Sequence, residues 1–214
     1  MENTADQNAE ATMRHVIYDR FGERDVLQVV SADVPVPGDD QVLVRVHGAG
    51  LNPIDWKTRK GLGFAARQIE NSLPWTPGYD VAGEVVGVGA NVTTLVGFPA
   101  GGGGYAQYAL AAADELAIVP EELDLVSAGA LPLAALTAWQ ALFEMAKLES
   151  GQKILIHAGA GGVGHFAVQF ALERGAHVIA TASAGNRDFL AELGVHEVID
   201  YRNTDIAEEC YGLD

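Results

Sequence analysis

The segment HAGAGGVGHFAVQFALERGAHVIATAS, residues 157–183, decides the fold predicted for this chain. It holds a G-x-G-x-x-G pattern at Gly159, Gly161 and Gly164, after the apolar run KILI and before a helical pattern. A glycine turn between a strand and a helix is typical of dinucleotide-binding units, although it can also serve packing alone. We expect the first glycine to allow the tight turn, the second to admit a pyrophosphate and the third to let helix and strand pack closely. The predicted cofactor-binding turn comprises Gly159, Ala160, Gly161, Gly162, Val163 and Gly164.

Ser183 stands at the end of the second predicted strand, where an NAD-binding chain places a carboxylate on the adenine ribose. Serine has no carboxylate to place on the ribose, and its small side chain leaves room for a 2′-phosphate. Arg187 could donate hydrogen bonds to this phosphate, and Tyr201 could flank the adenine. An exposed helix arginine is the alternative for Arg187. Together these residues favour NADPH over NADH as the cofactor.

The pattern of apolar residues divides the chain into two parts. Short β-branched runs with turn residues between them fill residues 13–110 and predict a small barrel or sandwich. Residues 124–148 read as helix with a break near Pro132, and residues 153–201 alternate strand and helix. That alternation predicts α/β structure with a parallel sheet, of which only three strands are present. We predict a disordered leader at 1–12, a β-rich domain at 13–125 and a partial nucleotide-binding domain at 126–214.

Composition narrows the function classes. The formal net charge is −16, from 29 acidic and 13 basic residues, which argues against nucleic acid and anionic membranes as partners. No apolar run approaches the roughly 20 residues that span a bilayer. The one cysteine, Cys210, allows neither an internal disulfide nor a thiolate zinc site. We expect a cytoplasmic protein.

Several separated motifs occur in a specific order: GLNPIDWK (50–57), PGYDVAGEV (77–85), GGYAQYAL (103–110), LPLAALTAWQAL (131–142) and AGAGGVGHFAVQ (158–169). With them the chain resembles the medium-chain dehydrogenase/reductase superfamily, in its zinc-free quinone oxidoreductase and enone reductase branch. The resemblance implies a GroES-like β-rich catalytic domain, a Rossmann NADPH-binding domain and a homodimer.

Zinc-dependent members of this family carry a cysteine near position 52 and a Gly-His-Glu where this chain has Gly78-Tyr79-Asp80. Asn52 replaces the cysteine here. A catalytic zinc needs about three protein ligands, so we predict no metal. The resemblance also shows that the rest of the Rossmann sheet is missing, which suggests a fragment.

The resemblance implies hydride transfer from NADPH to a small α,β-unsaturated carbonyl compound or a quinone. Lys57 and Tyr79 are the predicted catalytic residues, Asn52 would position the nicotinamide ribose or the substrate, and Thr137 would approach the nicotinamide. Each has a structural alternative: an exposed lysine, a buried tyrosine with its hydroxyl satisfied, a turn former and a helix residue bonded to its own backbone. The alternative function is an NADPH-binding protein without turnover, structural or regulatory.

Overall fold

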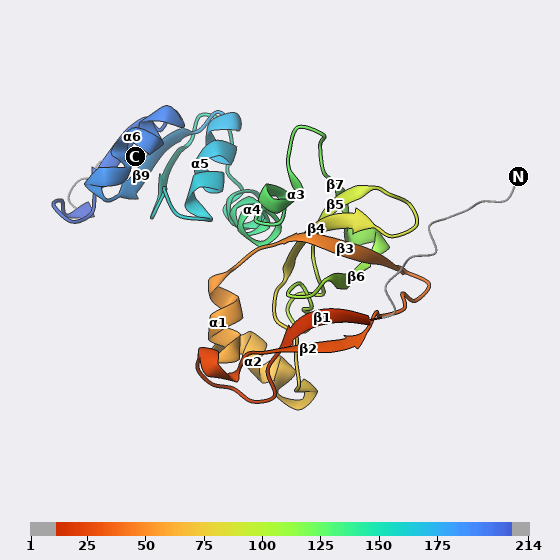
Figure 1. Cartoon of the computed structure of the whole chain (residues 1–214). Coiled ribbons are helices and arrows are strands. Elements are labelled where there is room, and N and C mark those ends of the chain that lie inside the picture. The colour runs from red at the N-terminus through yellow and green to blue at the C-terminus, as the bar shows by residue number, and fades with distance from the viewer. Residues whose placement is uncertain (1–11, 207–214) are drawn as a thin grey trace, which may run out of the picture. The chain divides into compact units, whose positions relative to one another are not determined.

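The computed structural model describes residues 12–206 (Figure 1). The chain divides into two compact units, Met1–Leu133 and Ala134–Asp214. The predicted boundary, after residue 125, therefore lies inside the first unit. Residues 1–11 of the predicted leader lie outside the described part of the chain, and the first strand begins at Thr12.

The first unit is built on antiparallel strands, as the short β-rich runs predict. Its larger sheet has the strand order β6-β3-β4-β5-β7, and β1 pairs with β2 in a separate ribbon. Gly48 lies opposite α3, because a Cβ at this position would come within 2.9 Å of the Val126 Cα. The strands are β1 (Thr12–Ile17), β2 (Gln28–Asp33), β3 (Gln41–Ala49), β4 (Asp80–Val85), β5 (Asn91–Leu95), β6 (Tyr108–Ala112) and β7 (Ala117–Ile118).

Two short helices lie between β3 and β4. Asn52 is the N-cap of α1, and Pro53 takes its first position, where a missing N–H costs nothing. The Asp55 carboxylate accepts the Asn52 backbone N–H at 2.7 Å, which fixes the start of this helix. The helices of this unit are α1 (Pro53–Arg59), α2 (Gly63–Ile69) and α3 (Leu125–Ala128), with short 3-10 turns η1 (Arg24–Val26), η2 (Glu70–Ser72) and η3 (Ala113–Glu115).

The second unit has a parallel sheet with the order β10-β9-β8, which confirms the predicted α/β alternation. The predicted break at Pro132 is also confirmed, because α3 ends before it and α4 begins at it. The core packs Val168 of α5 against Val178 and Ala180 of β9 and Leu190 of α6. The helix α4 (Pro132–Trp139) begins in the last two residues of the first unit and continues into the second. The other elements of the second unit are the π-helix η4 (Gln140–Met145), β8 (Lys153–Ile156), α5 (Gly164–Glu173), β9 (His177–Ala182), η5 (Ala184–Asn186), α6 (Arg187–Glu192) and β10 (Glu197–Asp200).

Within residues 12–206, none of the helices combines the length and the apolar character that a membrane crossing would need.

Candidate functional site

The glycine turn between β8 and α5 packs tightly against β9. A Cβ at Gly159 would lie 2.7 Å from the Ala180 Cβ, and one at Gly164 would collide with the Ala158 carbonyl. The third glycine therefore serves close packing, as predicted. The first glycine does as well, because the left-handed residue of the turn is Ala158, with φ 52°. We expected Gly159 to allow the tight turn, and this explanation is wrong, because Gly159 instead makes room for Ala180 of β9.

The outer side of this turn is open. A Cβ at Gly162 would meet no atom within 4 Å, and the nearest atom to one at Gly161 is the Ala158 carbonyl oxygen at 3.1 Å. Within residues 12–206, the backbone N–H groups of Gly162, Val163 and Gly164 have no hydrogen-bond acceptor. They lead into the ten-residue helix α5, which begins at Gly164 with Val163 as its N-cap, and free N–H groups and the helix dipole at such an end favour a phosphate. The turn thus fits a pyrophosphate.

Thr181 on β9 fastens this turn to the sheet. Its hydroxyl accepts the Ala158 N–H at 3.0 Å, and its carbonyl accepts the Gly159 N–H at 2.9 Å. Thr181 is 2% exposed. The turn is therefore held in one place before any ligand binds, which lowers the entropy cost of binding.

The structure places Ser183 directly after β9, where its hydroxyl contacts the Asn186 amide at 3.2 Å. Arg187 is exposed, and its guanidinium donates to the Val198 carbonyl of β10 at 3.2 Å. Tyr201 follows β10 and is half exposed, with the Arg202 guanidinium 5.8 Å from its ring centre. The carboxyl ends of two neighbouring parallel strands therefore carry these residues, which is the usual place for a nucleotide.

Thr137 lies on α4 in the second unit and is exposed.

In the first unit, Asn52 is held by two buried carboxyl groups. Its side-chain amide donates to Asp80 Oδ2 at 2.8 Å, and its backbone N–H donates to Asp55 Oδ2 at 2.7 Å. Asp80 Oδ1 accepts the Leu133 N–H in the first turn of α4 at 2.7 Å. Burial raises the pKa of both the Asp55 and the Asp80 carboxyl groups above their usual value. Asn52 is thus held in a fixed orientation.

Tyr105 completes this network. Its hydroxyl donates to Asp55 Oδ2 at 3.0 Å and lies 3.4 Å from the Gly50 carbonyl oxygen. Burial, followed by the charge of Asp55, raises the pKa of this hydroxyl. Asp55, Asp80 and Tyr105 each stand in one of the motifs that carry the resemblance, but we did not predict them as site residues. The spacing of Asn52 and Asp55 was the one available signal, since it matches a helix capping box.

The other two predicted catalytic residues lie in different environments. Lys57 is exposed on α1, with its ammonium 5.6 Å from the Trp56 ring centre. Tyr79 is 0% exposed and donates its hydroxyl to the Pro99 carbonyl at 3.1 Å. Its ring packs in the core against Trp75 and Phe98. The hydroxyl of Tyr79 therefore has a protein partner, as the structural alternative expected.

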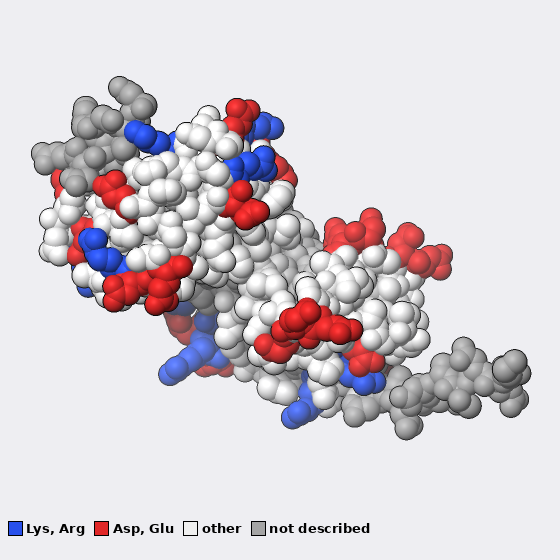
Figure 2. All heavy atoms as spheres, turned by 90° about the horizontal axis from the view of Figure 1, so that it is seen from above, with Lys and Arg blue, Asp and Glu red and all other residues white. Residues whose placement is uncertain are grey.

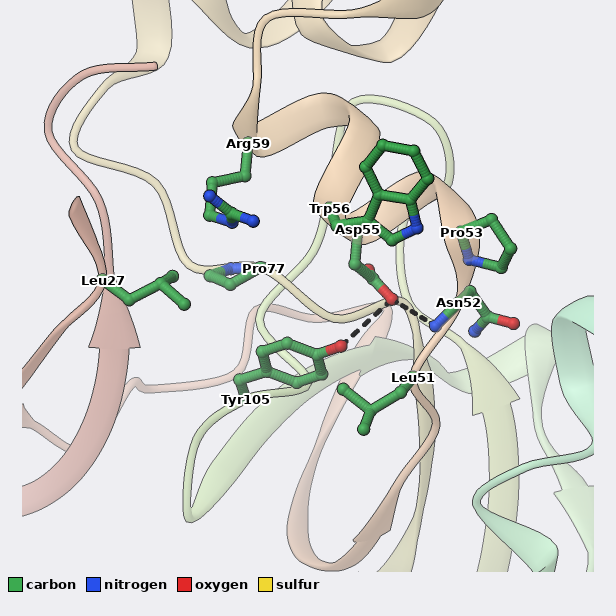
Figure 3. A pocket seen from close by; sticks show the side chains of 9 residues that line it. All are labelled: Leu27, Leu51, Asn52, Pro53, Asp55, Trp56, Arg59, Pro77 and Tyr105. Carbon is green, nitrogen blue, oxygen red and sulfur yellow. Dashed lines mark hydrogen bonds between the residues drawn. The ribbon is translucent and has the colours of Figure 1, made fainter. Parts of the chain in front are cut away.

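A cavity of about 460 Å³ lies beside α1 (Figure 3). Its polar lining is Asn52, Asp55, Arg59 and Tyr105, and neither Lys57 nor Tyr79 lines it. The apolar lining comes from α1 and from separate loops: Leu27, Leu51, Pro53, Trp56 and Pro77. The structure thus brings Asn52 together with residues that the sequence did not single out.

Within the described part of the chain, no three His, Cys, Asp or Glu side chains gather as metal ligands would. Cys210 lies outside the described residues. The surface in Figure 2 shows several groups of acidic side chains separated by uncharged areas, with fewer basic side chains between them.

Comparison with known proteins identifies both parts of the chain. Residues 38–121 match the model of the alcohol dehydrogenase GroES-like domain, and residues 162–213 match the model named zinc-binding dehydrogenase. A curated relative, the chloroplastic quinone-oxidoreductase homolog of Spinacia oleracea, is 42% identical over 207 residues, with 90% of this chain and 62% of the relative covered. The GroES-like and Rossmann-type domains expected from the resemblance are confirmed.

Solved structures agree with this assignment. The quinone oxidoreductase of Coxiella burnetii has a TM-score of 0.86 and 42% identity, over 92% of this chain and 65% of that one. The CurK enoyl reductase has a TM-score of 0.82 and 30% identity, over 92% of this chain and 62% of that one. The chain therefore spans less than two thirds of the length of these proteins.

Proposed function

Because the chain belongs to the medium-chain dehydrogenase/reductase superfamily, in its quinone oxidoreductase branch, we propose that it serves NADPH-dependent reduction of a quinone or an α,β-unsaturated carbonyl compound. The observation that carries this proposal is the turn between β8 and α5. Its inner glycines leave no room for side chains, and its outer side presents three N–H groups without acceptors in the described chain. Such a turn is suited to a pyrophosphate.

The preference for NADPH over NADH rests on the end of β9. Ser183 offers a hydroxyl where a carboxylate would repel a 2′-phosphate. Two arginines are close to this edge of the sheet: Arg187 reaches β10, and Arg202 follows it. Guanidinium groups suit phosphate because they offer several donors in one plane. Tyr201 has an exposed ring on which an adenine can stack.

NADPH, when bound, supplies a hydride to the electrophilic carbon of the substrate. Negative charge then develops on the substrate oxygen, and a preorganised donor for that oxygen is typically worth 10²–10³ in rate. The exposed ammonium of Lys57 is the donor that we propose. Tyr79 does not share this role in our proposal, because its hydroxyl is fully buried and bonded to Pro99.

The proposed reaction does not use zinc. The amide of Asn52 is engaged with Asp80, and the phenol of Tyr79 is engaged with Pro99. Neither group is a usual zinc ligand. Homodimer formation and a cytoplasmic location remain predictions, and one relative is described as chloroplastic.

Both substrate classes have support. The spinach and Coxiella relatives are described as quinone oxidoreductases, and CurK is described as an enoyl reductase. Either substrate gains a hydride at carbon and a charge at oxygen, so the same donors serve both.

The test is NADPH consumption with 1,4-benzoquinone and with cyclohex-2-enone, with the products identified. We expect hydroquinone or cyclohexanone as the product and loss of turnover in Lys57→Ala, with NADPH binding retained. Lys153→Ala, an exposed lysine at the start of β8, is the control. NADPH binding with no turnover of either compound would instead support the alternative, a structural or regulatory NADPH-binding protein.

A further inference from the structure

The cavity beside α1 has a mainly apolar lining, and no described side chain fills its interior. Trp56 and Leu51 are 45% and 85% exposed, so the cavity is open to solvent on their side. Pro53 and Pro77 contribute flat, rigid surfaces. A volume of about 460 Å³ accommodates a ligand of one ring with a short side chain.

Arg59 is the unusual residue of this lining. It is 9% exposed, and its one hydrogen bond from the side chain goes from Nη1 to the Gly22 carbonyl at 2.7 Å. Within residues 12–206, no carboxylate lies within ion-pair distance of it. Figure 3 shows its guanidinium directed toward Pro77, on the cavity side of α1. A guanidinium has five donors and is costly to bury without an anion.

Asp55 and Asn52 are bonded to other residues of the chain. Asp55 Oδ2 accepts from the Asn52 N–H and the Tyr105 hydroxyl (Figure 3). The Asn52 amide donates to Asp80. Asp55 Oδ1 is fully buried and has no hydrogen-bond partner within residues 12–206, and its burial keeps it from facing a ligand in the cavity. Burial also favours the neutral form of this carboxyl group by raising its pKa. Among the residues that line the cavity, the charged donors are therefore those of Arg59.

The surroundings of the cavity are more basic than the chain as a whole, whose net charge is −16. The ammonium groups of Lys57 and Lys60 lie 5.6 and 5.7 Å from the Trp56 ring centre. Lys60 is paired with Glu23 at 2.7 Å, whereas Lys57 has no ion pair within the described residues. This local excess of cations favours an anion near Trp56.

We propose that this cavity is a binding site for a small, flat, unsaturated carboxylate, with the carboxylate on Arg59 and the unsaturated part against Trp56. Arginine and a carboxylate form two parallel hydrogen bonds, which fix the orientation of the ligand. The indole ring provides a large apolar surface for a flat partner. The site lies wholly in the first unit, so this inference does not depend on the proposed cofactor or on turnover.

The test is calorimetric titration of the whole chain with trans-cinnamate at low salt, without NADPH. The uncharged trans-cinnamamide has nearly the same shape and is the matched probe. We expect cinnamate to bind at least tenfold more tightly, on the order expected for hydrogen bonds to a charged group. Equal affinities for the two compounds, or no binding of cinnamate, would overturn the proposal.

Three variants locate the site. Arg59→Gln should reduce cinnamate affinity about tenfold or more and should leave cinnamamide affinity nearly unchanged. Trp56→Ala changes an exposed side chain, so we expect it to fold normally and to weaken both compounds severalfold. Arg67→Gln, an exposed arginine outside the cavity, should change neither affinity.

Circular dichroism shows whether each variant folds. If Arg59→Gln does not fold because the Gly22 contact is lost, two measurements still test the proposal. They are the affinities of Trp56→Ala and the comparison of cinnamate with cinnamamide. Cinnamate affinity that is unchanged in Trp56→Ala would place the ligand elsewhere and contradict the proposal.

Discussion

The side-chain amide of Asn52 donates to the buried carboxylate of Asp80 over 2.8 Å, although the two residues are 28 positions apart in the chain. The second oxygen of Asp80 accepts the Leu133 N–H. One carboxylate thus connects the loop before α1 with the first turn of α4.

The first prediction concerns this connection. Asp80 is 1% exposed, and its two oxygens each accept one N–H. In Asp80→Asn, one of these donors would face an NH₂ group, so the variant should lose about 1–3 kcal/mol of stability. The urea midpoint followed by tryptophan fluorescence measures this loss. The double variant with Asn52→Asp exchanges donor and acceptor and should recover part of it. The exposed Asp33→Asn is the control, and an equal midpoint in Asp80→Asn would contradict the prediction.

The glycine turn gives a prediction that separates folding from binding. Gly164→Ala places a methyl group against the Ala158 carbonyl, so it should lower stability by about 1–3 kcal/mol and weaken NADPH binding. Gly162→Ala has open space around its methyl group, so its unfolding midpoint should stay constant while NADPH binding weakens. Gly185→Ala is equally unhindered and lies outside the turn, so it should change neither. Equal NADPH affinity in Gly162→Ala and Gly185→Ala would remove the turn from the cofactor site.

The glycine turn and its two flanking strands could be predicted from the sequence because a local pattern encodes them. KILI precedes the turn, HVIATA follows the helix, and both form parallel strands. The role of Gly159 could not be predicted, because it depends on Ala180 in another strand.

The hydrogen-bond network around Asn52 could not be predicted from the sequence, for the same reason. Asp55 is close to it in the chain, but Asp80 and Tyr105 come to it from strand β4 and from the loop before β6. Such contacts arise from tertiary packing rather than from local spacing. Tyr79 and Lys57 looked alike as candidates, and only burial distinguishes them: one is enclosed and the other is exposed.

Cofactor preference should respond to the residue after β9. In Ser183→Asp, a carboxylate would repel a 2′-phosphate and could accept hydrogen bonds from a ribose hydroxyl. The ratio of NADPH affinity to NADH affinity should therefore fall at least about tenfold, as one charged contact is worth roughly that much. Titration with both cofactors measures it. Asp188→Asn, one position after Arg187 and exposed, serves as the comparison. An unchanged ratio in Ser183→Asp would show that the 2′ position lies elsewhere.

Stability should depend on pH through Asp55. Burial raises the pKa of its carboxyl group above the usual 3.8, so the folded chain holds this proton more tightly than the unfolded chain. The contribution of Asp55 to stability is therefore present at low pH, and it is lost as the pH rises from about 3.8 through the higher folded pKa. Relative to Asp55→Asn, the wild type should lose stability over this range. Urea midpoints of both proteins between pH 3 and 7 test this.

Asp124 is a control for the same experiment, because the pKa of its carboxyl group is lowered rather than raised. Hydrogen bonds from Ser127 lower the pKa of its carboxyl group, so its contribution is present above 3.8 and is lost as the pH falls. Relative to Asp124→Asn, the wild type should gain stability as the pH rises. Two differences of the same sign would mean that the pKa of Asp55 is not raised in the folded chain.

Tyr79 provides the last test of the assignment of roles. Burial raises the pKa of its hydroxyl to about 12, and this hydroxyl already donates to Pro99. Tyr79→Phe keeps the ring among Trp75 and Phe98 and removes one hydrogen bond, so stability should fall by about 0.5–1.5 kcal/mol. Turnover of 1,4-benzoquinone with NADPH should stay within about twofold, whereas Lys57→Ala should lower kcat by 10² or more, as for loss of an oxyanion donor. If Tyr79→Phe instead lowers kcat tenfold with an unchanged urea midpoint, its hydroxyl must leave Pro99 and reach the substrate during the reaction.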